Sequence, residues 1–177
     1  MIQTLLAGMD LSNLSKIPDQ DVNELVAWTL AKFPWVVAEG LYVELVAETP
    51  WTPRARRKGF SGSTWKLNDK DNTQPWDRRF PLEAKHYILV RVVSIAAEHY
   101  PYSYTYRKRA GAMTFQDWRE EFVGLLAHEL QHVVQSLMSK TARPKWSEVD
   151  AERRAMEVLA DFREFRLTKG LSTAKVG

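Results

Sequence analysis

His128, Glu129 and His132 have the residue types and the spacing of a metal-dependent hydrolase site, because together they form an H-E-x-x-H motif. On an α-helix, residues four apart differ by about 40° in direction and about 6 Å in rise, so both imidazoles leave the same face. They can bind one divalent ion, and Glu129 then stands beside that ion as a general base for an activated water molecule. The motif predicts a zinc hydrolase site. The competing interpretation is a helix with two surface histidines and an unrelated glutamate.

The motif requires a helix, and the residues around it predict one. Apolar residues at helical spacing cover more than half of its circumference, as expected for a central helix. The stretch Thr114-Phe115-Gln116-Asp117 resembles a capping box, and we expect the helix to run from there to about Ser139. A buried helix must satisfy the polar groups of the motif, and a metal ion does so. The apolar positions are Phe122, Leu125, Leu126, Leu130, Val133, Val134 and Leu137.

A catalytic zinc site has three protein ligands and one open position, so a third ligand is needed. No histidine follows His132. His86 and His99 lie upstream at spacings that do not favour them, and we expect them at a strand end or on the surface. Carboxylates downstream are better candidates. Ser147-Glu148-Val149-Asp150 is a second capping pattern, and it predicts a helix that runs to about Thr168.

Two glutamates of this second helix, Glu148 and Glu152, lie one turn apart beside a stripe of small residues, Ala151 and Ala155, that allows close packing on the first helix. Glu148 is the preferred third ligand. Glu152, Asp150 and an upstream histidine remain alternatives. The competing interpretation of Glu148 and Asp150 is that of acids favoured in a first turn by the helix dipole and by capping.

Here the chain resembles a known family. Gluzincin-type metallopeptidases pair H-E-x-x-H with a downstream glutamate in an E-x-x-A-D or E-x-x-A-N motif, and this chain has Glu148-Val149-Asp150-Ala151-Glu152. The likeness, over residues 120–160, is to the short ImmA/IrrE-type peptidases and to the glutamate-bearing helix of M48-type proteases. The resemblance implies a zinc ligand at Glu148. It implies that Glu152, in place of the usual Asp or Asn, accepts a hydrogen bond from a ligand histidine.

The rest of the chain predicts an α+β, minimal zincin-like domain. Strands are expected at residues 41–48, 60–67 and 86–93, and Tyr100 to Tyr106 alternates aromatic with small or polar residues, as in an extended segment. We expect a small, twisted, mainly antiparallel sheet on the H-E-x-x-H helix, with the last helix beneath it. A helix from Asp19, a candidate N-cap, should end before Pro34. Its apolar stripe is Val22, Leu25, Val26, Leu30 and Phe33.

Composition fits one domain spanning residues 1–177, with residues 1–17 as an arm or first helix and residues 170–177 as a frayed tail. No apolar run approaches the ~18 residues that cross a bilayer, and residues 1–9 do not resemble a signal peptide. The absence of cysteine excludes disulfides and cysteine-ligated zinc, and fits a cytoplasmic setting best.

The predicted function is therefore that of a zinc-dependent metallopeptidase, with one Zn²⁺ ion and a peptide or protein substrate bound as an extended strand along a sheet edge. A second electrophile is expected among Tyr102, Tyr104, Tyr106 and Arg143. The alternative is an inactive zincin-like fold or a basic binding module for nucleic acid or a protein. The net charge is +3, and basic residues gather at 54–58 and 107–109, although two solvated loops are the preferred explanation of these residues. The sequence predicts no membrane partner.

Overall fold

The computed structural model describes residues 9–47, 62–66, 85–92, 95–104, 112–139 and 147–170. Its first unit is a β-α-β arrangement in which β1 (Asp10–Asn13) leads through α2 (Asp19–Leu30) into β2 (Leu41–Ala47), and the two strands pair in parallel. The expectation of an arm or a first helix at residues 1–17 is wrong for residues 10–13, which form this short edge strand. These four residues include no β-branched side chain and so give little indication of a strand in the sequence. Their pairing with β2 determines that they form one.

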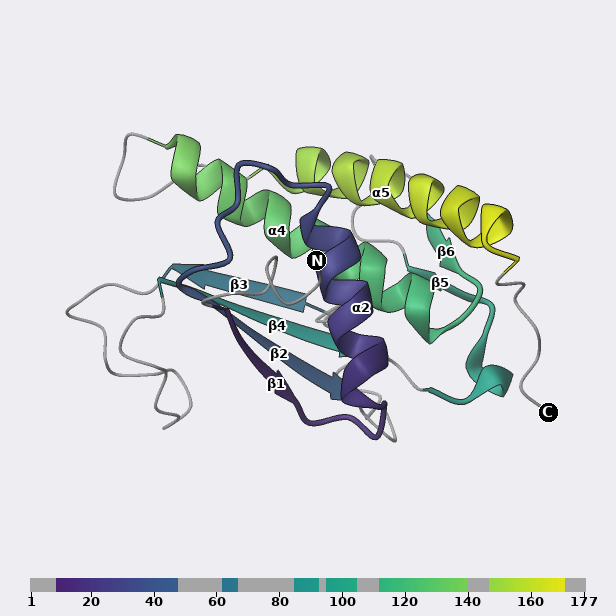
Figure 1. Cartoon of the computed structure of the whole chain (residues 1–177). Helices are drawn as coiled ribbons and strands as arrows, with labels where there is room; N and C mark the ends of the chain where they lie inside the picture. Colours follow the sequence, from purple (N-terminus) through teal and green to yellow (C-terminus); the bar gives the residue numbers. More distant parts are fainter. Residues whose placement is uncertain are drawn as a thin grey trace, which may run out of the picture.

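The main sheet has the strand order β1-β2-β4-β3, where β3 is Gly62–Lys66 and β4 is His86–Val92 (Figure 1). The β1–β2 and β2–β4 pairs are parallel, and only β3–β4 is antiparallel. The prediction of a mainly antiparallel sheet is therefore wrong for this sheet. The strand β4 is buried along nearly its whole length, from His86 to Val92. Such a continuous buried run is typical of a strand with a parallel neighbour. Between β2 and β4 the chain first forms β3, which pairs with the other edge of β4.

Two further strands, β5 (Tyr102–Tyr104) and β6 (Met113–Phe115), form a separate antiparallel pair, and the 3-10 helix η1 (Ala97–His99) precedes it. The extended conformation predicted for Tyr100 to Tyr106 is confirmed for residues 102–104. Residues 105 and 106 lie outside the described part. Phe115 at the end of β6 is fully buried, and it brings this hairpin against the first half of the next helix.

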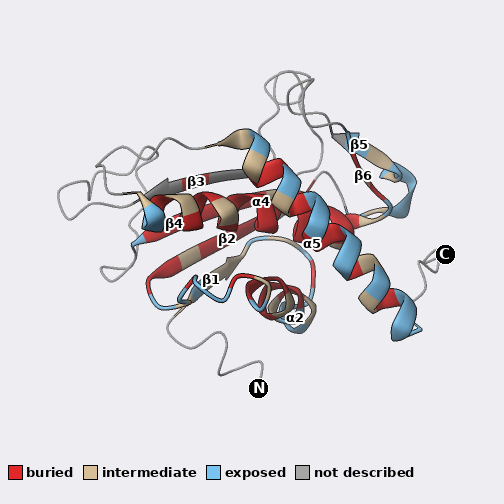
Figure 2. Ribbon diagram, turned by 90° about the horizontal axis from the view of Figure 1, so that it is seen from above, coloured by how far each residue is buried: buried red, intermediate tan, exposed pale blue. Residues whose placement is uncertain are grey.

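The helix α4 (Trp118–Met138) lies across one face of the sheet beside α2, and α5 (Glu148–Thr168) packs antiparallel on α4 (Figure 1). The prediction of a central helix is confirmed, because nearly every residue from Trp118 to Val134 is buried (Figure 2). The predicted apolar stripe is wrong only at Leu137, which is exposed in the last turn. The α5 stripe that begins with Ala151 and Ala155 is buried as predicted, while its opposite face is exposed. The predicted stripe of α2 is buried as well.

Two helix starts differ from the predicted ones. The N-cap of α4 is Asp117, whose side chain accepts hydrogen bonds from the backbone N–H of Arg119 and Glu120, both at 3.0 Å. The expected start at Thr114 is wrong because Thr114 belongs to β6. Similarly, Asp19 is the first residue of α2 rather than its cap, and it accepts a hydrogen bond from Asn13. At α5 the prediction is confirmed, since Ser147 caps the helix and accepts from the N–H of Asp150.

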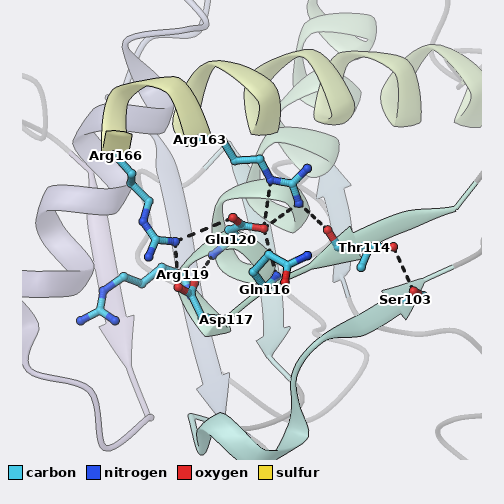
Figure 3. A network of polar contacts seen from close by, with 8 residues as sticks. All are labelled: Ser103, Thr114, Gln116, Asp117, Arg119, Glu120, Arg163 and Arg166. Atoms are coloured by element: carbon cyan, nitrogen blue, oxygen red, sulfur yellow. Dashed lines mark hydrogen bonds and ion pairs between the residues drawn. The ribbon is translucent and has the colours of Figure 1, made fainter. Parts of the chain in front are cut away.

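An ionic network joins the start of α4 to the end of α5 (Figure 3). Nη1 of Arg166 lies 2.7 Å from Oδ2 of Asp117, and Nη2 of Arg163 lies 2.7 Å from Oε2 of Glu120. Both arginines come from the last two turns of α5, while Asp117 is the N-cap of α4 and Glu120 lies in its first turn. The network therefore fixes one end of the α4–α5 pair. Among the described helices, none is both long and apolar enough to span a membrane.

Candidate metal centre

His128 and His132 lie one turn apart on α4, and Glu148 is the first residue of α5. Because the two helices are antiparallel, the first turn of α5 lies beside the second half of α4, and the three side chains converge. Nε2 of His128 is 3.2 Å from Nε2 of His132. Oε2 of Glu148 is 3.4 Å from the first nitrogen and 3.6 Å from the second. These residues form the one group of at least three potential metal ligands found among the described residues.

The three distances fit a tetrahedral metal. Zinc binds histidine nitrogen and carboxylate oxygen at about 2.0–2.2 Å, so a tetrahedral ion separates its ligand atoms by about 3.3–3.6 Å. The observed separations are 3.2, 3.4 and 3.6 Å. The exposed fractions of the side chains are 10% for His128, 4% for His132 and 29% for Glu148. The group is thus shielded on the α4 side and more open at Glu148, as a site with a free fourth position needs to be.

The charges of the group are strongly coupled. Hydrogen bonds with His128 and then His132 hold the pKa of Glu148 well below its ordinary range. Burial lowers the pKa of His132, but its hydrogen bonds with Glu148 and Gln135 outweigh that effect, and the net shift is upward. Without a metal, the ionised Glu148 carboxylate therefore stabilises the protonated imidazole of His132, and the protonated imidazole stabilises the ionised carboxylate. A divalent cation supplies the same positive charge between the same groups.

Glu129 lies beside the group on the same helix and is buried, with an exposed fraction of 5%. Burial raises the pKa of this carboxyl above its ordinary value. The charge of His128, the hydrogen bond from Thr64 and the charge of His132 act in the opposite direction. The hydroxyl of Thr64, on β3, lies 2.6 Å from Oε2 of Glu129 and donates to it. A carboxylate held in this way, close to two imidazoles, suits proton transfer.

Sequence reasoning missed two residues of this environment, Thr64 and Gln135. Gln135 lies one turn beyond His132, and its Oε1 is 3.0 Å from Nδ1 of His132. A glutamine three residues after a ligand histidine on one helix face was a readable signal for such a contact. For Thr64 the sequence contained no such signal, because 65 residues separate it from Glu129.

The alternative third ligands lie elsewhere. Glu152 is buried one turn further along α5 and does not join the group. The hydrogen bond predicted between Glu152 and a ligand histidine stays a prediction. Asp150 pairs with Arg153 at 2.7 Å. His86 is the buried first residue of β4, and His99 is exposed at the end of η1, which agrees with the strand-end and surface positions expected for them.

Of the predicted electrophiles, Tyr102 lies on β5, where its ring stacks on that of Phe115 with centroids 6.5 Å apart. Tyr104 is the last residue of β5, and Tyr106 and Arg143 lie outside the described residues. The basic runs at 54–58 and 107–109 lie outside them too. The role of an electrophile therefore stays a prediction.

Comparison of the chain with protein-family models, with curated proteins and with solved structures gives no match. What the chain does must therefore be inferred from the site itself. The site is a buried His-His-Glu group on two packed helices, which is consistent with a zincin-like metal centre.

Proposed function

We propose that this chain is a zinc-dependent metallopeptidase in which His128, His132 and Glu148 hold the metal ion. The observation that carries the proposal is the convergence of their three ligand atoms at 3.2–3.6 Å. Two histidines, one glutamate and an open position are a ligand set of catalytic zinc. The gluzincin-like sequence motif supports the same set. Two histidines and a carboxylate also suit non-haem iron(II), so the identity of the metal is the first thing to measure.

Glu129 is the catalytic base of the proposed reaction. A zinc ion, when bound, lowers the pKa of coordinated water to near neutrality and polarises a carbonyl oxygen. Glu129 accepts the proton of the attacking water and then gives it to the leaving amine. A carboxyl that accepts and then returns a proton works best when its pKa lies closer to the working pH than that of an exposed glutamate, and burial shifts the pKa of Glu129 in that direction.

The substrate we propose is a peptide bound in an extended conformation along β3. Among the described strands, β3 ends the sheet, and its pairing with β4 uses one edge only. A peptide that adds to the other edge gains backbone hydrogen bonds, which is a common mode of peptide recognition. Thr64 on this strand contacts Glu129, so a peptide on β3 would bring a carbonyl close to the base.

Two measurements test the proposal. The first is metal analysis of protein purified without added zinc, where we expect about one equivalent of zinc per chain. The second compares wild type with Glu129→Gln on a broad peptide library. We expect hydrolysis to fall by about 10²–10⁴-fold in the variant, the usual contribution of general acid–base catalysis, with zinc content unchanged.

Each outcome separates the proposal from its rivals. If wild type and Glu129→Gln both bind zinc but neither hydrolyses any peptide of the library, the chain is an inactive, metal-holding domain. Absence of zinc together with a salt-dependent shift of DNA indicates a basic binding module. Hydrolysis that is equal in wild type and variant excludes Glu129 as the base.

A further inference from the structure

Gln135 contacts both helices that contribute to the metal centre. Its Oε1 lies 3.0 Å from Nδ1 of His132 and accepts a hydrogen bond from the backbone N–H of Ser147 at 3.1 Å. Its Nε2 donates to the backbone carbonyl of Ser147 at 3.0 Å. Ser147 directly precedes Glu148 in the chain. One side chain therefore joins the histidine of α4 to the start of α5.

The backbone of Ser147 fixes which end of the amide faces His132. A backbone N–H can only donate and a carbonyl can only accept, so the oxygen of the Gln135 amide must face the N–H and its nitrogen the carbonyl. The oxygen is then the atom that faces Nδ1 of His132. An amide oxygen can only accept, so Nδ1 must carry the hydrogen. In the neutral imidazole, Nε2 is then left with a lone pair, and Nε2 is the atom 3.6 Å from Glu148.

The same contacts hold Glu148 in place. Ser147 is the N-cap of α5, and its hydroxyl accepts from the N–H of Asp150 at 3.3 Å. Two hydrogen bonds from Gln135 attach this cap to α4. Because Glu148 is the first residue of the helix, attaching the cap sets the distance of its carboxylate from the two histidines.

We propose that Gln135 is a positioning residue that sets the tautomer of His132 and the position of Glu148 at once, and so preorganises the metal centre. The inference rests on the proposed function, because it assumes that the group binds a metal ion. In this role Gln135 orients the ligand histidine His132 through its side-chain amide, where many metal sites use a carboxylate. Such partners commonly change metal affinity by about 10–100-fold when removed.

Metal affinity of full-length variants tests this inference without any assay of hydrolysis. Gln135→Met has nearly the same shape and can make none of the three contacts. We expect its Kd for Zn²⁺ to rise by about 10–100-fold and the visible absorption of the Co²⁺-loaded protein to change in intensity and position. Gln116→Met is the matched control, because this exposed glutamine precedes the N-cap at the other end of α4, and with the described residues it bonds only through its backbone N–H, to Glu120. It should leave Kd and spectrum unchanged.

Gln135→Glu separates the two roles. A carboxylate still accepts from Nδ1–H of His132 and from the N–H of Ser147, but it cannot donate to the carbonyl of Ser147. We expect Gln135→Glu to recover most of the lost affinity; a loss equal to that of Gln135→Met contradicts the tautomer argument. This variant also keeps the inference testable if Gln135→Met does not fold.

A double-mutant cycle with Glu148→Gln tests the second role. If Gln135 positions Glu148, its removal costs less affinity once Glu148 can no longer serve as a charged ligand, so the two losses are not additive. Additivity within about twofold overturns that role. A wild type that binds neither Zn²⁺ nor Co²⁺ refutes the proposed function itself. A wild type that binds one equivalent, with Gln135→Met of equal affinity, refutes only the role of Gln135.

Discussion

The hydroxyl of Thr64 lies 2.6 Å from Oε2 of Glu129 and 3.2 Å from the backbone carbonyl oxygen of the same residue. Thr64 is buried in the middle of β3, and Glu129 is buried in the middle of α4. The contact therefore joins the strand on which we place the substrate to the residue that we propose as the base. It also restricts the rotation of the Glu129 carboxylate.

Replacing Thr64 with Val should move the acid limb of the pH–rate profile to higher pH. The hydrogen bond from Thr64 lowers the pKa of Glu129, against the dominant upward effect of burial, so its loss raises that pKa further. A base works only when deprotonated, and its activity is lost as pH falls through its pKa. A hydrogen bond to a charged group is worth about 1.5–3 kcal/mol, which corresponds to about one to two pH units. Thr64→Ser keeps the hydroxyl and should keep the wild-type profile. Identical profiles for Val and wild type would exclude an effect of Thr64 on the base.

Removal of the Glu148 carboxylate should remove the metal. In Glu148→Ala two histidines remain, and two protein ligands rarely hold zinc. Ligand binding stabilises the folded state by about 4 kcal/mol at a thousandfold excess over Kd. We therefore expect zinc to raise the Tm of wild type and a chelator to reverse the rise, while the Tm of Glu148→Ala responds to neither. Asp150→Ala, two residues beyond Glu148 on the same helix, should respond like wild type.

The metal-free protein should owe part of its stability to the His132–Glu148 pair in a limited pH window. The folded pKa of Glu148 is lowered from 4.5, so its contribution is present above that pH and is lost as pH falls through the lower folded value. The folded pKa of His132 is raised from 6.5, so its contribution is present below that pH and is lost as pH rises through the higher folded value. The Tm difference between metal-free wild type and Glu148→Gln should be largest between these values. A difference that is the same at every pH would contradict the pairing.

Gly124→Ala should destabilise the fold although alanine favours helices. A Cβ at Gly124 would lie 2.7 Å from Cε1 of Phe115, a fully buried ring that cannot move freely. Overpacking of this kind costs about 1–3 kcal/mol, against about 1 kcal/mol gained in helix propensity. We expect a net loss of up to about 2 kcal/mol in the free energy of unfolding, measured by chemical denaturation. The loss should shrink in a Phe115→Leu background, and an equal loss there would show that the ring is not the cause.

Arg166→Met should lower stability without weakening metal binding. Only 9% of the Arg166 side chain is exposed, and it pairs with Asp117 at the end of the α4–α5 pair shown in Figure 3. Loss of a buried charge-assisted contact should reduce the free energy of unfolding by about 2–3 kcal/mol. Arg153→Met, an exposed control on the same helix, should cost less than about 0.5 kcal/mol. Zinc affinity should stay unchanged, because this network is far from the metal centre: Glu120, its acid nearest in sequence to His128, lies about 12 Å from that histidine along α4. A parallel loss of affinity would mean that the two ends of the helix pair are coupled.

The sequence alone determined the parts of this protein that depend on local geometry. Residues 128, 129 and 132 lie on one helix, so their spacing fixes which side chains share a face before any tertiary contact forms. The start of α5 at Glu148 followed from its capping serine for the same reason, and so did the buried faces of α2, α4 and α5, apart from Leu137. These predictions needed only helical periodicity and the chemistry of the first turn.

Tertiary structure decided everything that joins distant segments. The strand at Asp10–Asn13 exists because β2 pairs with it, and the parallel alignment of β2 with β4 depends on the path of the chain between them. Thr64 reaches Glu129 only because β3 lies under α4. The orientation of Gln135 follows from Ser147, the N-cap of the other helix. Long-range pairing has no period in the sequence, since its free energy depends on which segments the folded core brings into contact.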